Sequence, residues 1–242
     1  MQQAHALYAV AMSEQGHPPF FDRCRLVLCL GPEEMDRVSA DALSELLQAG
    51  DVASVIFSPG QLDESVFQKL VAPLVKAAQA QEVAVVIADL SRVAGRVSAD
   101  GLQLGQDVNA LGEAIGKFSP AIMIGAANVK TRHNALVIGE LRPDYVMFGK
   151  PDGDIRPEPH PKNLDLGNWW SQMVEIPCIV MGGSELESVV DVAQSGAEFV
   201  ALRSAIFAPN LDAKTNTTGP DGVRRANQLL DQHAPRFEMV EE

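Results

Sequence analysis

The sequence is poor in cysteine, and this excludes several kinds of site. Its three cysteines, Cys24, Cys29 and Cys178, are too few and too scattered for a disulfide framework or a zinc site. Cys29 and Cys178 fall within apolar runs, which predicts that both are buried in strands. Unpaired cysteines fit a reducing cytoplasm, and that is the location we expect.

Positive charge is also scarce. The 19 lysines and arginines face 32 aspartates and glutamates, which gives a net charge of −13. Nucleic-acid-binding domains usually carry a basic patch, and anionic membranes attract basic surfaces. We therefore expect neither nucleic acid nor a membrane as a partner. Single phosphate groups can still bind locally, because backbone N–H groups at helix starts hold them without side-chain charge.

Long hydrophobic runs are missing as well. No apolar stretch reaches the roughly 18 residues that a membrane-spanning helix needs. The segment MQQAHALYAVAMSEQGHPPFF (1–21) contains a short apolar patch. It has no basic region before the patch and no convincing cleavage site, so it does not predict a signal peptide.

What the sequence does contain is a repeated alternation of apolar runs and helical patterns. The apolar runs are 25–30, 52–58, 83–89, 101–105, 121–127, 145–149, 178–183 and 199–207. Each run is continuously apolar, which is typical of parallel strands buried on both faces. In the first helical stretch we expect Ser39 to cap the helix and Gly50 to end it. Pro73 predicts a kink or break in the helix that follows the second run.

Eight strand–helix units predict an α/β fold of the TIM (β/α)8 barrel type. An open, doubly wound sheet is the alternative. We expect the barrel to span residues 25–235, with an N-terminal extension at 1–24 and an acidic tail at 236–242. Active sites of such barrels lie where the strands end and the following loops begin, so the residues after each apolar run are the candidates for function.

The ends of the last two apolar runs predict a phosphate-binding seat. Gly182 and Gly183 end the seventh run, and glycines let the backbone approach a ligand closely. Arg203 and Ser204 lie in the eighth run, where an arginine can add a bidentate contact to phosphate. Phosphate often binds at this place in TIM barrels. The alternative is that the glycines only form tight turns and the arginine pairs with a surface acid.

Two aspartates at the ends of consecutive strands suggest a metal site. Asp89 and Asp107 could together hold Mg²⁺, which prefers oxygen ligands and keeps waters and substrate phosphates in its shell. The alternative is that Asp89 caps the next helical segment and Asp107 is solvated. Gln106 either hydrogen-bonds a ligand or satisfies the backbone of its loop.

Two lysines are placed to face the mouth of the barrel. Lys130 follows the fifth run and Lys150 the sixth, and either is a candidate catalytic residue or a solvated side chain. Asn128 and Thr131 follow the fifth run and Gly149 ends the sixth, and these three residues are candidates for substrate binding.

Three segments resemble the thiamine phosphate synthase and TenI family. SADGLQLGQD (98–107) is similar to the family's GADGVHLGQ, and PDYVMFG (143–149) to its ADYVGFG. The third segment, 176–207, reads IPCIVMGG at its start and SAIF at its end, and it resembles the family's IPVVAIGG and VVSAIF. The segments occur in the family's order and spacing, and the resemblance covers residues 25–208.

The resemblance implies a TIM barrel with transferase activity. Such a synthase joins hydroxymethylpyrimidine diphosphate to thiazole phosphate with Mg²⁺ and releases pyrophosphate, so its partners are small phosphorylated thiazole and pyrimidine ligands. Asp89 occupies the position of the family's first metal-binding aspartate, and Asp107 lies one residue before that of the second. Lys130 replaces the histidine of the family's SVHT motif. Barrels of this kind are often dimers, and the adjacent Trp169 and Trp170 allow a homodimer contact.

Other positions depart from the family pattern. The second run ends in Ser58-Pro59-Gly60, where the family has the basic QLREK, and Arg156 and Lys162 lie in a proline-rich loop in place of a threonine-rich one. The sequence therefore predicts a divergent thiamine phosphate synthase. The alternatives are a non-catalytic barrel that binds thiazole phosphate or thiamine phosphate, a TenI-like thiazole tautomerase that uses Lys130, and another small phosphate-ester enzyme.

Overall fold

The computed structural model describes residues 22–105, 107–207 and 218–237 of the chain. Most of the predicted extension and tail lies outside these ranges, so the division of the chain into barrel, extension and tail stays a prediction. Within the described ranges, no helix combines the length and apolarity that crossing a bilayer requires.

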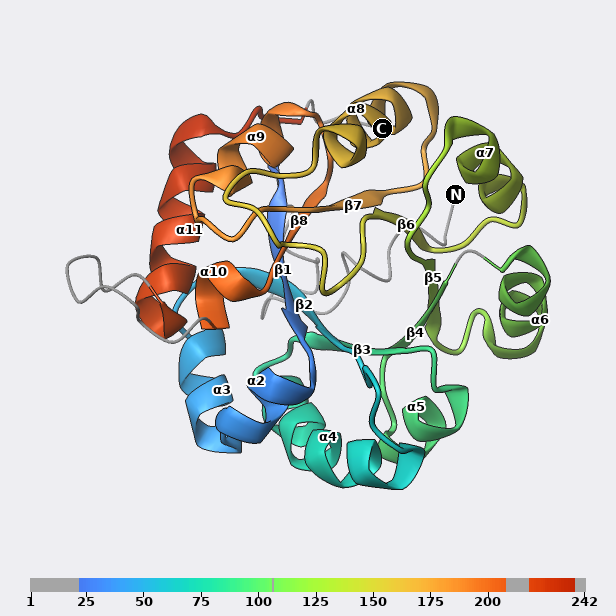
Figure 1. Ribbon diagram of the computed structural model, residues 1–242, viewed down its shortest axis with the longest axis vertical. Coiled ribbons are helices and arrows are strands. Elements are labelled where there is room, and N and C mark those ends of the chain that lie inside the picture. The colour runs from blue at the N-terminus through green and yellow to red at the C-terminus, as the bar shows by residue number, and fades with distance from the viewer. Residues whose placement is uncertain (1–21, 106, 208–217, 238–242) are drawn as a thin grey trace, which may run out of the picture.

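The strands form a closed parallel barrel in chain order, and helices surround it (Figure 1). The strands are β1 (Arg25–Leu30), β2 (Val52–Phe57), β3 (Ala84–Ala88), β4 (Gly101–Leu104), β5 (Met123–Ala126), β6 (Tyr145–Phe148), β7 (Cys178–Met181) and β8 (Phe199–Leu202). Closure comes from pairing of β1 with β8, in a register that places Arg25 beside Phe199 and Leu28 beside Leu202. The predicted TIM barrel is confirmed, and the open-sheet alternative is wrong.

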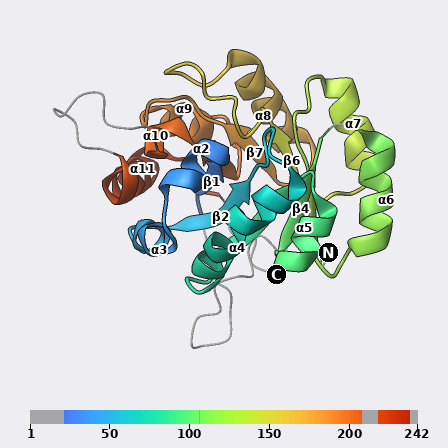
Figure 2. The same ribbon diagram turned by 60° about the horizontal axis from the view of Figure 1, so that its bottom comes forward.

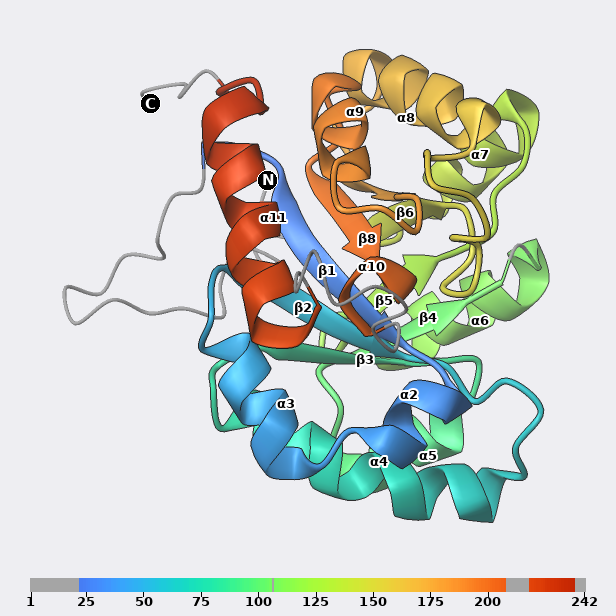
Figure 3. The same cartoon turned by 60° about the vertical axis from the view of Figure 1, so that its left-hand side comes forward.

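Helices follow the strands around the barrel. They are α2 (Pro32–Arg37), α3 (Ala40–Leu47), α4 (Glu64–Gln79), α5 (Ser91–Val97), α6 (Val108–Phe118), α7 (Arg132–Glu140), α8 (Pro161–Met173), α9 (Ser188–Gln194), α10 (Ser204–Phe207) and α11 (Gly219–His233). The last helix, α11, packs against β1, α3 and α9, which joins the end of the described chain to its beginning (Figure 3).

The strands are continuously apolar because both of their faces are buried. Side chains such as Cys29, Met147 and Phe199 form one cluster inside the barrel. Alternate side chains, including Leu28 and Cys178, pack outward against the helices in a second cluster. The prediction that Cys29 and Cys178 are buried strand residues is confirmed.

Several local expectations need correction. The eighth apolar run is not one strand, because β8 ends at Leu202 and residues Ser204–Phe207 form α10. Ser39 caps α3 by accepting a hydrogen bond from the Ala42 N–H group, as predicted, but α3 ends at Leu47 and not at Gly50. Pro73 lies inside α4, which continues through it to Gln79, so the helix is not broken there.

A recurrent acidic contact ties the strands together in pairs at their amino ends. Asp100, Asp144 and Glu198 each directly precede an even-numbered strand, β4, β6 or β8. Their carboxylates accept hydrogen bonds from N–H groups near the start of the preceding strand: Asp100 from Val85 at 2.8 Å, Asp144 from Ile124 at 2.7 Å and Glu198 from Cys178 at 2.8 Å. We call these three contacts the acid clamps.

The first strand pair is joined differently. Asp51 directly precedes β2, and its carboxylate forms a 2.6 Å ion pair with Arg25 at the start of β1. The acid clamps and this ion pair all lie at the amino ends of the strands. The carboxyl ends are thus left to the loops that form the functional site.

Candidate active site

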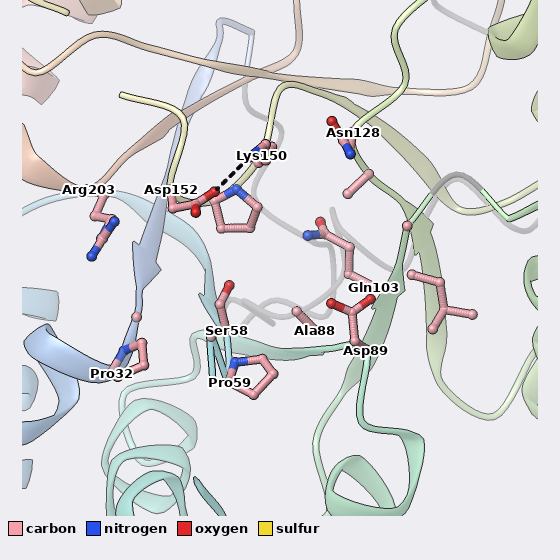
Figure 4. A pocket seen from close by; sticks show the side chains of 16 residues that line it. Pro32, Ser58, Pro59, Ala88, Asp89, Gln103, Asn128, Lys150, Asp152 and Arg203 are labelled. Atoms are coloured by element: carbon pink, nitrogen blue, oxygen red, sulfur yellow. Dashed lines mark ion pairs between the residues drawn. The ribbon is translucent and has the colours of Figure 1, made fainter. Parts of the chain in front are cut away.

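A cavity of about 320 Å³ opens at the carboxyl ends of the strands. Residues that follow or end β1 to β6 and β8 line it, as the barrel geometry predicts. Its polar lining side chains, shown in Figure 4, are Ser58, Asp89, Gln103, Asn128, Lys150, Asp152 and Arg203. Two positive and two negative charges are thus mixed with neutral hydrogen-bonding groups around one pocket.

Gln103, on β4, lies in the middle of this lining, between Asp89 and Asn128 (Figure 4). Its side-chain oxygen accepts a hydrogen bond of 3.0 Å from the hydroxyl of Tyr145, on β6. Both residues are buried. Burial, reinforced by nearby Cys29 and Asp144, raises the pKa of Tyr145 well above its ordinary value. The phenol therefore stays protonated and continues to donate, which directs the amide NH₂ of Gln103 away from Tyr145.

Gly125, on β5, makes room for this arrangement. A Cβ atom at Gly125 would lie 2.0 Å from Cζ of Tyr145, so the tyrosine ring covers the glycine directly. Any larger residue would displace the ring and with it the donor to Gln103.

Asp89 follows β3 and lines the pocket with its backbone in the left-handed region, at φ 62°. Desolvation raises the pKa of its carboxyl above the ordinary value, and a hydrogen bond from the Gly105 N–H group opposes the rise. The alternative role that the sequence allowed, capping of the next helix, is wrong because Leu90 is the N-cap of α5 and has no side-chain cap. The Asp89 carboxylate is instead available to the pocket.

Asp107 has a structural task. It is the N-cap of α6, and its Oδ1 accepts hydrogen bonds from the N–H groups of Asn109 at 3.0 Å and Ala110 at 3.2 Å. It is exposed and does not line the pocket. The neighbouring substrate-binding candidate, Gln106, lies outside the described residues.

Arg203 follows β8 and enters the pocket from the side of α2. Its guanidinium forms a 3.0 Å ion pair with Glu34, a buried residue of α2 whose carboxylate also accepts a hydrogen bond from the Gly31 N–H group. This ion pair links α2 to the residue between β8 and α10, and Figure 2 shows α2 directly after β1 on this side of the barrel. Burial acts against the charge of Arg203, but the hydrogen bond and charge of Glu34 prevail and its pKa is raised.

Two donors of the pocket have no partner among the described residues. They are the Nε–H group of Arg203 and the hydroxyl of Ser58, and both atoms are buried. Buried donors without an acceptor cost free energy, so a ligand that carries oxygen atoms would satisfy them. Lys150 adds positive charge at the rim, where its amine lies 3.9 Å from the carboxylate of Asp152.

The predicted catalytic residue Lys130 and the predicted substrate-binding residues Thr131 and Gly149 do not line this pocket. Lys130 is exposed in the loop after β5, and Thr131 is the N-cap of α7, where it accepts from the Asn134 N–H group. Gly149 adopts φ 106°, a conformation that favours glycine, and its carbonyl accepts a hydrogen bond from the Asn128 N–H group.

The predicted phosphate seat is only partly joined to the pocket. Arg203 lines the pocket, but Gly182 and Gly183 are buried and do not, and Ser204 begins α10 outside it. The loop between β6 and α8 crosses over the ends of β7 and β8 at this place (Figure 1).

Sequence reasoning missed several residues of the site. Gln103 was visible only as part of LQLG, and nothing in the sequence paired it with Tyr145, which is 42 positions away. Nothing in the sequence singled out Glu34, whose partner Arg203 is far along the chain. Only the closed barrel brings such side chains together.

The chain is similar to known proteins over most of its length. The family profile described as thiamine monophosphate synthase matches residues 26–206. A thiamine-phosphate synthase of Rhodospirillum centenum is 31% identical over 186 residues, covering 76% of this chain and 89% of the relative. One of Hyphomonas neptunium is 32% identical over 220 residues, covering 86% and 94%.

Among solved structures, a thiamine phosphate pyrophosphorylase from Pyrococcus furiosus superposes with a TM-score of 0.67 at 19% sequence identity, over 86% of this chain and 98% of that one. This structural similarity supports the fold, and the sequence matches show which family the chain belongs to. The chain belongs to the thiamine monophosphate synthase family.

Proposed function

We propose that this protein is a thiamine-phosphate synthase, a transferase that couples hydroxymethylpyrimidine diphosphate to thiazole phosphate and releases pyrophosphate. The observation that carries the proposal is the similarity to synthases across nearly their whole length, 89% and 94% of two of them. The pocket at the carboxyl ends of the strands supports it, because two of its buried hydrogen-bond donors have no acceptor among the described residues.

In this proposal the neutral polar groups orient the rings. The Gln103 amide, fixed by Tyr145, and the Asn128 side chain offer hydrogen bonds from adjacent strand ends to the nitrogen atoms of a heterocycle. Holding two reactants in line removes the entropy cost of bringing them together, which is a large part of such a reaction's barrier.

The charged groups stabilise the departing pyrophosphate. Arg203 presents a free Nε–H group and Lys150 an exposed amine, and both lie where negative charge would grow as the carbon–oxygen bond breaks. Lys130 is exposed after β5 and remains a candidate for contact with a substrate that extends out of the pocket.

Members of the family generally depend on Mg²⁺. Mg²⁺ usually binds through one or two carboxylates and takes its remaining ligands from water and substrate phosphates. Asp89 fits such a role because its carboxylate faces the pocket, whereas Oδ1 of Asp107 is committed to α6. The described residues hold no cluster of three metal-ligating side chains, so the substrate diphosphate would complete the shell. Bound there, the ion would neutralise the leaving group.

The test is an assay of the purified protein with both substrates, which measures pyrophosphate release and thiamine phosphate formation with and without Mg²⁺. We expect turnover that requires Mg²⁺ and falls at least about 100-fold in Asp89→Asn, since one charge-stabilising group often contributes that much. Asp165→Asn, an exposed change of equal charge on α8, is the matched control. Binding of thiazole phosphate without pyrophosphate release would overturn the synthase in favour of a binding protein, and isomerised thiazole would favour a tautomerase.

A further inference from the structure

The N–H groups of the predicted phosphate seat already have acceptors. The Ser204 N–H group at the start of α10 donates to the carboxylate of Asp154 at 2.5 Å. The Ser184 N–H group, just after the two glycines, donates to the Arg156 carbonyl at 2.7 Å. Both acceptors belong to the loop between β6 and α8, which we call the β6–α8 loop (residues 149–160).

The β6–α8 loop also packs directly against Gly183. A Cβ atom at Gly183 would lie 1.9 Å from the carbonyl oxygen of Pro157, so the loop backbone rests directly on the glycine. Glu185 adds a longer N–H contact of 3.3 Å to the same carbonyl. Gly183 is therefore glycine because of the loop that covers it, and a phosphate at this position would meet the loop.

Asp154 accepts, with its own carboxylate, a hydrogen bond that a bound phosphate would otherwise accept. It is 4% exposed, whereas its neighbour Ile155 is 86% exposed, so the loop turns the carboxylate inward and the apolar side chain outward. A buried carboxylate needs compensating hydrogen bonds, and the Ser204 N–H group supplies one. The seat thus holds an anion, but one that the protein itself provides.

The loop does not satisfy every donor near the seat. The Ser188 hydroxyl, at the start of α9, is buried and has no partner among the described residues. Its oxygen lies 3.1 Å from the position that a Cβ atom of Gly182 would take. The loop provides no acceptor for the Ser188 hydroxyl, so it fills the phosphate seat only in part.

We propose that the β6–α8 loop is an autoinhibitory contact, in which Asp154 and the Arg156 carbonyl occupy the phosphate seat and a phosphate monoester must displace them to bind. A phosphate and the Asp154 carboxylate compete for the same Ser204 N–H group, so they cannot bind it together. The apparent affinity for phosphate equals the intrinsic affinity of the open seat multiplied by the fraction of molecules whose loop is open. The inference rests on the proposed function only for the identity of the natural ligand, thiazole phosphate.

The first test uses inorganic phosphate, which needs neither the thiazole nor the pyrimidine. Calorimetric titration would compare the wild-type protein with Asp154→Asn and Asp154→Ala. We expect phosphate to bind about 10-fold or more tightly to Asp154→Ala than to the wild type, with Asp154→Asn between them, since a hydrogen bond to a charged group is lost. Glu158→Gln, which removes one charge from an exposed position of the same loop, is the control and should match the wild type. Equal affinities, or no binding to any variant, would overturn the proposal.

A second measurement does not depend on whether the variants keep their loop conformation. In the amide NMR spectrum of the wild-type protein, saturating phosphate should shift the Ser184 and Ser204 resonances together with that of Ile155. Shifts at the seat without any change at Ile155 would mean that phosphate binds beside the closed loop, which contradicts displacement.

The two proposals can fail separately. Turnover by the wild type with equal phosphate affinity in all variants would keep the synthase and overturn the autoinhibitory loop. Tighter phosphate binding in Asp154→Ala without turnover by any variant would keep the loop and overturn the synthase.

Discussion

The hydroxyl of Tyr145, on β6, donates a 3.0 Å hydrogen bond to the side-chain oxygen of Gln103, on β4, across the intervening strand β5. The bond is possible because β5 carries Gly125 beneath the tyrosine ring. Strand β5 thus provides the space, β6 the donor and β4 the acceptor of a hydrogen bond that fixes the pocket-lining amide of Gln103.

Tyr145→Phe should destabilise the protein by about 1–3 kcal/mol, because it leaves the buried Gln103 oxygen without a donor. Urea unfolding would measure the change. The double variant Tyr145→Phe with Gln103→Leu removes both partners and should recover part of the loss. A single variant as stable as the wild type would show that the hydrogen bond contributes nothing net.

Gly125→Ala should cost about 3 kcal/mol or more, since a methyl group 2.0 Å from the Tyr145 ring must displace it. Gly116→Ala is the matched control. Gly116 lies within α6 with no atom within 4 Å of its Cβ position, so alanine there should stabilise by up to about 1 kcal/mol. Thermal unfolding of both variants would decide, and equal effects at the two glycines would refute the role assigned to Gly125.

Asp89→Asn should make the protein more stable at neutral pH. Burial raises the pKa of Asp89 in the folded state above its ordinary value of 3.8, so ionisation costs the folded state more than the unfolded one. Asparagine tolerates the left-handed backbone and can still accept from the Gly105 N–H group.

The gain in Asp89→Asn should appear as the pH rises above 3.8 and reach its full size above the raised folded-state pKa. It should vanish below 3.8, where the carboxyl is protonated in both states. Urea midpoints measured from pH 3 to pH 8 would test this, and a variant that is less stable at pH 7 would contradict it.

Asp107 allows capping and metal binding to be separated. Asp107→Ala removes the acceptor of two N–H groups of α6 and should cost about 0.5–2 kcal/mol. Asp107→Asn keeps an equally good cap while it removes the charge, so its thermal stability should equal that of the wild type. If Asp107→Asn keeps its stability but loses Mg²⁺-dependent turnover, the aspartate is a metal ligand after all.

Removal of an acid-clamp acceptor should lower the stability of the protein more than neutralisation of the same carboxylate. Asp144→Ala and Glu198→Ala should each cost about 1–3 kcal/mol, because the Ile124 and Cys178 N–H groups lose their acceptors. Burial raises the pKa of both carboxyls, so ionisation disfavours the folded state. Asp144→Asn and Glu198→Gln, which keep an oxygen acceptor, should therefore be close to neutral or stabilising in urea unfolding at pH 7.

The sequence predicted the barrel well because its signal is local and repeated. The first strand lies at 25–30 as expected, and the other runs except 199–207 were only slightly too long at their ends. The error at 199–207 has a physical cause. Ala205, Ile206 and Phe207 are apolar because they pack as a helical turn, and an apolar run this short does not distinguish a strand from a helix.

The site was harder to predict because its contacts join distant parts of the chain. Asp89, Asn128, Lys150 and Arg203 line the pocket because strand ends alone place them there, and the roles predicted for them stay predictions. The glycines of the seat were identified from their pattern, but Pro157, which covers Gly183, lies in a loop without periodicity. No local signal in Asp154 indicates that its carboxylate is buried against Ser204.

The acid clamps bear on how such a gene evolves. They lie at the amino ends of the strands and involve no group of the pocket, so selection for a stable barrel and selection for chemistry act on opposite ends of the same strands. Substitution of an exposed pocket residue such as Lys150 therefore leaves the acid clamps intact, whereas Gly125 and Tyr145 serve both the pocket and the stability of the barrel. The chemistry of those exposed positions can change without loss of the contacts that pair the strands.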